Sequence, residues 1–145
     1  MSSLDLDPYR VLVVDDEECV RMFAERALCQ AGYEVVVAPN GPAALRLVDT
    51  AVRFDLFVLD VQMPQMRGDE LARELRQRNL DAKVLFCTGD SERLLAERRV
   101  LSQNEAFVEK PVSLKALRDA VSLLLFGHSH GPSAGGVLLE QGLST

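Results

Sequence analysis

Short apolar runs alternate along the chain with segments of helical period. Five runs rich in β-branched and aromatic residues have the length and composition of strands: Arg10–Val14, Glu34–Ala38, Phe54–Leu59, Lys83–Cys87 and Ala106–Val108. Strands that alternate with helices are typical of a parallel sheet that is covered by helices on both faces. The pattern therefore predicts an α/β fold with five strands.

The clearest helix follows the first strand. Its apolar residues recur at helical spacing over Val20–Ala31, and Gly32 follows where a C-terminal cap glycine is expected. Less regular helical patterns cover Pro42–Thr50, Asp69–Arg78, Glu92–Gln103 and Leu114–Phe126. Pro42 suits a first helical turn, and Ser91 and Ser113 suit N-caps. Five helices are thus expected to interleave with the five strands.

The composition fits one globular domain. The chain has 145 residues, of which 48% are hydrophobic and 26% charged, and a domain of this size buries enough surface to fold without a disulfide or a structural metal. After residue 126 the sequence becomes rich in His, Ser, Gly and Pro. We expect an N-terminal extension at 1–8, a folded domain at 9–126, and a flexible tail or the start of a linker at 127–145.

Charge and cysteine content narrow the function classes. The net charge of −6, from 22 acidic and 16 basic residues, disfavours direct binding to nucleic acid or to an anionic membrane. The odd cysteine count, without CxxC spacing, suggests neither a disulfide framework nor a zinc site. The longest apolar runs, such as Val11–Val14, are far shorter than the roughly 20 residues that span a bilayer. We expect a cytoplasmic protein.

Polar residues stand at the ends of four of the predicted strands. Asp15 and Asp16 follow the first strand, Asp60 the third, Thr88 the fourth and Lys110 the fifth. In an open parallel sheet, ligands bind beyond the carboxyl ends of the strands, where the strand order reverses. The sequence therefore predicts that these side chains converge on one crevice.

The chemistry of this set favours phosphoryl transfer. Three clustered carboxylates repel one another unless they hold a proton or a cation, and Mg²⁺ is a hard cation that takes carboxylate and phosphate oxygens together. A threonine hydroxyl and a lysine ammonium are donors for the other phosphoryl oxygens. An aspartate can act as the nucleophile and form an acyl phosphate. The residues thus predict a magnesium-dependent phosphoryl site on a carboxylate.

Four short motifs contain the polar residues at the strand ends: Asp15-Asp16, the stretch from Asp60 to Gly68, Thr88-Gly89 and Lys110-Pro111. In their order and spacing, over about residues 9–126, the chain resembles the receiver domain of two-component response regulators. The resemblance implies a flavodoxin-like (βα)5 fold, a doubly wound parallel sheet with strand order 2-1-3-4-5 in a single domain.

The resemblance also implies roles for the site residues. Asp60 would accept a phosphoryl group from a phosphohistidine on a sensor histidine kinase or a histidine phosphotransfer protein. Asp16, Asp60 and the backbone carbonyl of Gln62 would bind Mg²⁺, and Asp15 would help directly or through a water molecule. The protein would then be a phosphoacceptor signalling switch that catalyses only its own phosphorylation and dephosphorylation.

The family pattern assigns the switch as well. Lys110 would pair with the phosphoryl oxygens, Thr88 would move inward to hydrogen-bond one of them, and Phe107 would rotate into the space that Thr88 leaves. Pro111 would follow a cis peptide bond, and Gly68 would permit a backbone turn that a side chain would hinder. The change would reach a downstream partner or a second copy of the chain through the fourth helix, fifth strand and fifth helix.

Two other function classes share this fold. Aspartyl-phosphate-forming phosphohydrolases place an Asp-x-Asp motif after the first strand, whereas this chain has adjacent aspartates followed by Glu17 and Glu18. A pseudo-receiver, which serves only as an interaction module, lacks one of the acceptor, acidic-pair or lysine positions, and all are present here. A stand-alone receiver and a receiver cut from a longer regulator or hybrid kinase both fit the chain.

The predicted fifth helix carries more apolar residues than one stripe needs. The stripe itself comprises Leu114, Leu117, Val121, Leu124 and Leu125. Leu123 and Phe126 lie off it. Extra apolar surface of this kind marks either a dimer or target face or an anchor for the tail.

Overall fold

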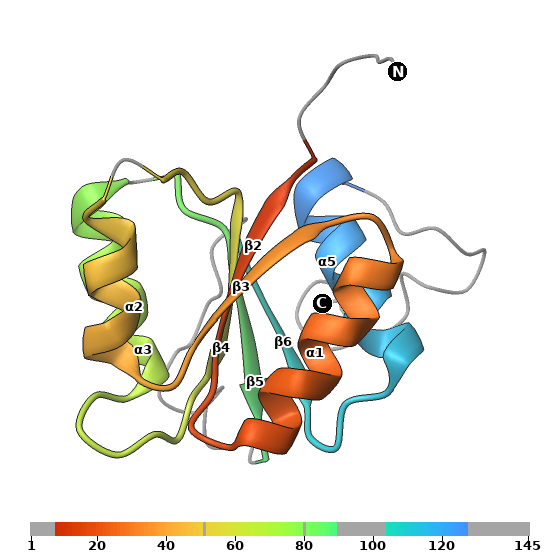
Figure 1. Cartoon of the computed structure of the whole chain (residues 1–145), viewed down its shortest axis with the longest axis horizontal. Helices are drawn as coiled ribbons and strands as arrows, with labels where there is room; N and C mark the ends of the chain where they lie inside the picture. Colours follow the sequence, from red (N-terminus) through yellow and green to blue (C-terminus); the bar gives the residue numbers. More distant parts are fainter. Residues whose placement is uncertain (1–7, 51, 80, 90–103, 128–145) are drawn as a thin grey trace, which may run out of the picture.

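The computed structural model of the chain describes residues 8–50, 52–79, 81–89 and 104–127. Within these ranges it forms five parallel strands and four α-helices (Figure 1). The strands are β2 (Arg10–Val14), β3 (Glu34–Ala38), β4 (Leu56–Asp60), β5 (Val84–Thr88) and β6 (Glu105–Glu109). The helices are α1 (Glu18–Gln30), α2 (Gly41–Val48), α3 (Gly68–Arg78) and α5 (Leu114–Phe126). The predicted helix at 92–103, its cap at Ser91 and the predicted tail lie outside the described residues.

The strands form one sheet in the order β3-β2-β4-β5-β6, and every neighbouring pair is parallel. This is the predicted order 2-1-3-4-5, so the flavodoxin-like fold is confirmed. Helices α1 and α5 lie on one face of the sheet, and α2 and α3 lie on the other (Figure 1). The strand order reverses between β2 and β4, and this reversal forms the crevice at which such sheets bind ligands.

Two apolar cores, one on each face, explain why the strands are almost continuously hydrophobic. Alternate side chains of β2 point to opposite faces. Leu12 and Val14 pack with α2 and α3, whereas Val11 and Val13 pack with α1 and α5. Burial on both faces is the usual condition of a parallel sheet.

The predicted bounds hold for β2 and β3, and the other strands differ by one or two residues. Strand β4 begins at Leu56 and not at Phe54, because Asp55 lies at a bend where its carboxylate accepts the backbone N–H of Arg10 at 2.8 Å. Strand β5 is shifted by one residue and includes Thr88. Strand β6 extends to Glu105, which is buried and paired with Arg76 at 2.6 Å.

Helices α2 and α5 each begin after a residue whose side chain accepts a first-turn N–H. The side chain of Asn40 accepts the N–H of Ala43 at 2.8 Å, and Pro42 lies in the first turn of α2, as predicted. Ser113 caps α5 in the predicted way, accepting the N–H of Ala116 at 3.0 Å. Helices α1, α2 and α3 each begin one or two residues earlier than predicted, because the starting residues are polar or glycine and carry no apolar signal.

Helix α5 has the predicted bounds, and its apolar side chains differ in how deeply they are buried. Leu117 and Val121 are buried against the sheet, whereas Leu114 is 40% exposed. Leu123, predicted to lie off the buried stripe, packs partly against the core. The ring of Phe126 contacts that of Tyr9 edge to face, with centroids 5.0 Å apart. Part of the extra apolar surface is therefore used within the chain.

None of the helices within the described ranges is long and apolar enough to cross a membrane.

Candidate acidic site at the carboxyl ends of the strands

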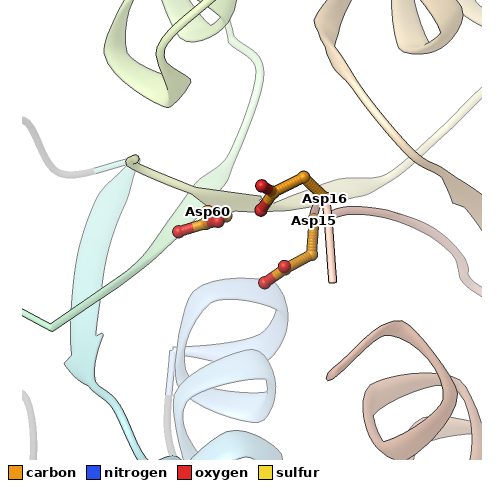
Figure 2. A group of neighbouring side chains, drawn as sticks. All are labelled: Asp15, Asp16 and Asp60. Carbon is orange, nitrogen blue, oxygen red and sulfur yellow. The ribbon is translucent and has the colours of Figure 1, made fainter. Parts of the chain in front are cut away.

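Four strand ends bring the predicted site residues together. Asp15 directly follows β2, Asp60 is the last residue of β4, Thr88 is the last of β5, and Lys110 directly follows β6. The carboxylates of Asp15, Asp16 and Asp60 lie side by side at this edge of the sheet (Figure 2), and each offers an oxygen within 4.8 Å of the others. The predicted convergence is present in the structure.

The three carboxylates differ in their access to solvent. Asp15 and Asp60 are 2% and 5% exposed, whereas Asp16 is exposed. Thr88, at the end of the neighbouring strand β5, is also buried. Asp16 is therefore the carboxylate of the cluster that is most accessible to solvent.

Lys110 provides the positive charge at the centre of the cluster. Its Nζ lies 3.1 Å from Asp15 Oδ2 and 3.2 Å from Asp60 Oδ1, and Glu17 Oε1 is 3.9 Å away. The peptide bond between Lys110 and Pro111 is cis, as predicted. The backbone N–H of Lys110 donates to the carbonyl of Thr88 at 2.8 Å, which ties the ends of β5 and β6 together.

This crowding changes the acid–base behaviour of the cluster. Burial, followed by the charge of Asp15, raises the pKa of Asp60 to about 6 despite the opposing effect of Lys110. Burial lowers the pKa of Lys110, but the hydrogen bonds and charges of Asp15 and Asp60 outweigh burial, and the pKa is raised overall. Lys110 is thus held as a cation, while Asp60 is a carboxylate whose charge is only partly balanced.

Two hydrogen bonds fix Asp15. Its Oδ1 accepts the backbone N–H of Glu17 at 2.9 Å, and its backbone carbonyl accepts Nη1 of Arg21 at 2.7 Å. The sequence reasoning missed Arg21. A basic residue on the first turns of a helix usually faces solvent, and a backbone carbonyl as its partner leaves no trace in the sequence.

The loop between β4 and α3 explains Gly68. A Cβ at this position would lie 2.3 Å from the carbonyl oxygen of Asp60, which is backbone and cannot move aside. We expected Gly68 to permit a backbone turn that a side chain would hinder, and the structure shows this hindrance: α3 begins so close to the Asp60 backbone that a side chain has no room. The left-handed backbone falls instead on Gln65, with φ of 72°, where Met66 N–H donates to the carbonyl of Pro64 in a γ-turn.

The remaining predicted residues lie around this centre. The backbone N–H of Gln62 donates to Asp60 Oδ1 at 3.3 Å, so its backbone adjoins the acceptor. Phe107 is 1% exposed, lies opposite Phe86 in the sheet and belongs to the core on the α2 and α3 face. Burial raises the pKa of Cys87 to about 12, so this thiol is a packing residue.

A cleft of about 410 Å³ adjoins the cluster between α1 and the connection from β6 to α5. Its wall consists of Glu17, Cys19, Val20, Phe23, Lys110, Pro111 and Val112. Most of these side chains are apolar, and Phe23 is 41% exposed. The ammonium of Lys110 therefore lies where an apolar surface meets the acidic cluster.

The donor set fits a magnesium ion. Mg²⁺ is bound in proteins by one or two carboxylates with waters and phosphate oxygens in the other positions. Here three carboxylates from two chain segments lie within reach of one ion, and one lysine does not balance their charge. Asp15, Asp16 and Asp60 are the residues that would hold it. The ion would neutralise charge at Asp60 and at a phosphoryl group.

An open parallel sheet in this order, with polar side chains gathered at its carboxyl edge, defines the class of doubly wound α/β proteins that bind ligands where the strand order reverses. The family model described as "Response regulator receiver domain" matches residues 11–122. The chain therefore belongs to the receiver domain family. Receiver domains bind Mg²⁺ at an acidic pocket, interact with histidine kinases and downstream effectors, and act as signalling switches.

Individual relatives show how much of a longer protein such a domain makes up. The chain is 40% identical over 116 residues to the sensor kinase CckA of Brucella abortus, covering 79% of this chain and 12% of that protein. It is 35% identical over 113 residues to the transcriptional regulatory protein YrkP of Bacillus subtilis, covering 78% of this chain and 48% of that protein. The chain thus spans half or less of the length of these curated relatives.

Among solved structures, the chain resembles the response regulator TrrA of Thermotoga maritima, crystallised in complex with Mg²⁺-BeF. The identity is 36%, the TM-score is 0.69, and the match covers 81% of this chain and 99% of that one. The chemotaxis protein CheY4 of Vibrio cholerae matches with a TM-score of 0.72 at 27% identity, covering 82% of this chain and all of that one.

Proposed function

We propose that the chain is a phosphoacceptor switch in which Asp60 accepts a phosphoryl group from a histidine kinase or a histidine phosphotransfer protein. The observation that carries this proposal is the placement of Lys110 between Asp15 and Asp60, at 3.1 and 3.2 Å, beside the exposed carboxylate of Asp16. This arrangement supplies a nucleophile, a fixed cation and a metal-binding carboxylate set at one point. The resemblance to TrrA with Mg²⁺-BeF supports magnesium as the ion.

The reaction needs little from the protein beyond positioning and charge. A carboxylate oxygen of Asp60 forms a bond to phosphorus as the bond from phosphorus to the donor imidazole nitrogen breaks, and the imidazole takes up a proton on leaving. Mg²⁺ held by Asp15, Asp16, Asp60 and the carbonyl of Gln62 would offset the negative charge at this step. Attack of water on phosphorus later releases phosphate and restores the Asp60 carboxylate.

Lys110 and Thr88 are the proposed contacts to the phosphoryl oxygens. Lys110 already adjoins Asp60, and its backbone is hydrogen-bonded to that of Thr88, so the two residues are mechanically linked. Phe107, next to Phe86 in the core, is the proposed aromatic residue of the switch. The downstream partner would bind the surface that includes β6 and α5.

The cleft beside Lys110 is our proposed docking place for the phosphodonor. It is mainly apolar, it includes the exposed ring of Phe23, and it opens next to the acceptor cluster. A donor helix seated there would bring its phosphohistidine to Asp60.

We take residues 9–126 as the receiver domain, and its cytoplasmic location stays a prediction from the sequence.

Intact-mass measurement tests the acceptor directly. The protein is incubated with a small acyl or amido phosphate donor, with and without Mg²⁺, as wild type, Asp60→Asn and Asp49→Asn. Asp49 is a matched control because it lies on the surface at the other end of the sheet, paired with Arg78. We expect a magnesium-dependent, hydrolysable gain of one phosphoryl group in the wild type and in Asp49→Asn, and none in Asp60→Asn.

Other outcomes identify the alternatives. No phosphoryl gain in the wild type, either from small donors or from a phosphorylated histidine protein, would indicate a pseudo-receiver. Continuous release of phosphate from unrelated esters would indicate a phosphohydrolase.

A further inference from the structure

The loop that joins β2 to α1 carries two of the three clustered carboxylates. The chain leaves the sheet at Asp15, whose backbone N–H still donates to the carbonyl of Ala38 at 3.3 Å, and α1 begins at Glu18. Asp15 is 2% exposed, so its own carbonyl is largely removed from water. A buried carbonyl needs a hydrogen-bond donor.

Arg21 supplies that donor. Its Nη1 lies 2.7 Å from the carbonyl oxygen of Asp15, in a partly buried position. This carbonyl belongs to the peptide that joins Asp15 to Asp16, so the guanidinium contacts the backbone between the two acidic side chains. Hydrogen bonds from a charged donor are shorter and stronger than neutral ones.

Asp15 and Arg21 also hold the other end of the loop, at Glu17. Glu17, the N-cap residue of α1, makes no side-chain capping bond. Its backbone N–H instead donates to Asp15 Oδ1 at 2.9 Å, and its carbonyl accepts the N–H of Arg21 at 3.1 Å. Arg21 therefore joins the first turn of α1 to Asp15 through both its backbone and its side chain.

We propose that Arg21 is a positioning residue for the metal site: by holding the Asp15 carbonyl, it fixes the directions in which the Asp15 and Asp16 carboxylates point. This inference rests on the proposed function, since it assumes that these carboxylates bind Mg²⁺. Groups that orient metal ligands without touching the ion commonly affect metal affinity by about 10- to 100-fold.

Charge alone makes the opposite prediction. Arg21 is a cation near a cation site, so a purely electrostatic effect of its removal would tighten Mg²⁺ binding. A merely structural role would lower the melting temperature and leave the affinity for Mg²⁺ unchanged. The sign of the change in affinity therefore separates positioning from both alternatives.

The test is a calorimetric titration of MgCl₂ into the metal-free full chain, without a phosphodonor, for wild type, Arg21→Gln, Arg21→Lys and Arg26→Gln. Arg26 is exposed on the same helix and serves as the matched control. We expect Arg21→Gln to weaken Mg²⁺ binding by about tenfold or more. Arg21→Lys, which keeps a donor, should lose less, and Arg26→Gln should match the wild type.

Amide hydrogen exchange of the metal-free protein gives a second readout. The Glu17 amide should exchange faster in Arg21→Gln, because its acceptor Asp15 is no longer held. Wild-type or tighter Mg²⁺ binding in Arg21→Gln and Arg21→Lys would overturn the proposal. Neither measurement uses phosphorylation, so failure of Asp60 to accept a phosphoryl group would count against the proposed function alone.

Discussion

The two ends of the sheet treat acidic side chains in opposite ways. At the amino ends of the strands, Glu34 pairs with Arg10 at 2.7 Å and Glu105 pairs with Arg76 at 2.6 Å. At the carboxyl ends, Asp15 and Asp60 share Lys110, and the exposed Asp16 adds to their charge. The amino end is thus balanced pair by pair, whereas the carboxyl end keeps excess negative charge. The difference shows where the chain gives up stability to keep an acidic cluster at one edge of the sheet.

Removing an arginine at the amino end should have the largest effect on stability. The side chain of Glu105 is 1% exposed, so Arg76→Ala would remove an ion pair from a buried carboxylate. Loss of one partner of a buried pair costs about 3 kcal/mol or more. We expect urea unfolding to show this loss. A stability equal to that of the wild type would mean that the amino end is not balanced by its ion pairs.

Removing a carboxylate at the carboxyl end should act in the other direction. Folding raises the pKa of Asp60 to about 6, so its ionised form is unfavourable in the folded protein at neutral pH. Asp60→Asn should therefore stabilise the metal-free protein by about 2 kcal/mol. Thermal unfolding in the presence of a chelator would measure this gain, and Asp49→Asn is the control. A clear drop in melting temperature for Asp60→Asn would contradict a crowded acidic site.

The pH dependence of folding stability tests the charge of Asp60 at the carboxyl end of the sheet. Because the pKa of Asp60 is higher in the folded than in the unfolded chain, the folded state takes up the proton first as the pH falls. The unfavourable contribution of ionised Asp60 is fully present above about pH 6 and disappears as the pH falls toward about 4. The stability difference between Asp60→Asn and wild type should shrink over this window in urea unfolding without metal. If the difference in the free energy of unfolding between Asp60→Asn and wild type stayed constant with pH, the higher stability of Asp60→Asn would come from packing and not from the charge of Asp60.

The smallest effect is expected from an exposed pair at the amino end. Glu34 and Arg10 have side chains that are 49% and 33% exposed. Exposed ion pairs contribute about 0.2 to 1 kcal/mol, so Glu34→Gln should lower the free energy of unfolding by less than about 1 kcal/mol. Added salt should reduce this small difference further. A loss as large as that for Arg76→Ala would show that burial does not set the strength of these pairs.

The sequence predicted the sheet well because both of its faces are apolar. Strands β2 and β3 and helix α5 have the predicted bounds. The error at β6 has a clear cause: Glu105 is charged and was therefore placed outside the strand, but Arg76 from a distant helix allows it to be buried. A pattern of apolar positions cannot show a partner that is distant in sequence.

The sequence predicted those site residues that stand at the ends of strands. Asp60, Thr88 and Lys110 could be placed together because the carboxyl ends of parallel strands meet at one edge. Arg21 could not be found, since its partner is a backbone carbonyl. For Gly68, the sequence indicated that a side chain would hinder the turn, and the path of the loop past the Asp60 carbonyl shows which group that side chain would meet.

The contact between Tyr9 and Phe126 has a consequence for how the domain is joined to other modules. The contact joins the start of β2 to the end of α5, which lie near each other at the amino end of β2 (Figure 1). The acidic cluster lies at the opposite, carboxyl end of the strands. Domains whose ends are close tolerate insertion into a host chain and circular permutation. Both connections of this fold to a longer polypeptide would therefore lie at one end of the domain, and the acidic cluster would lie at the other end.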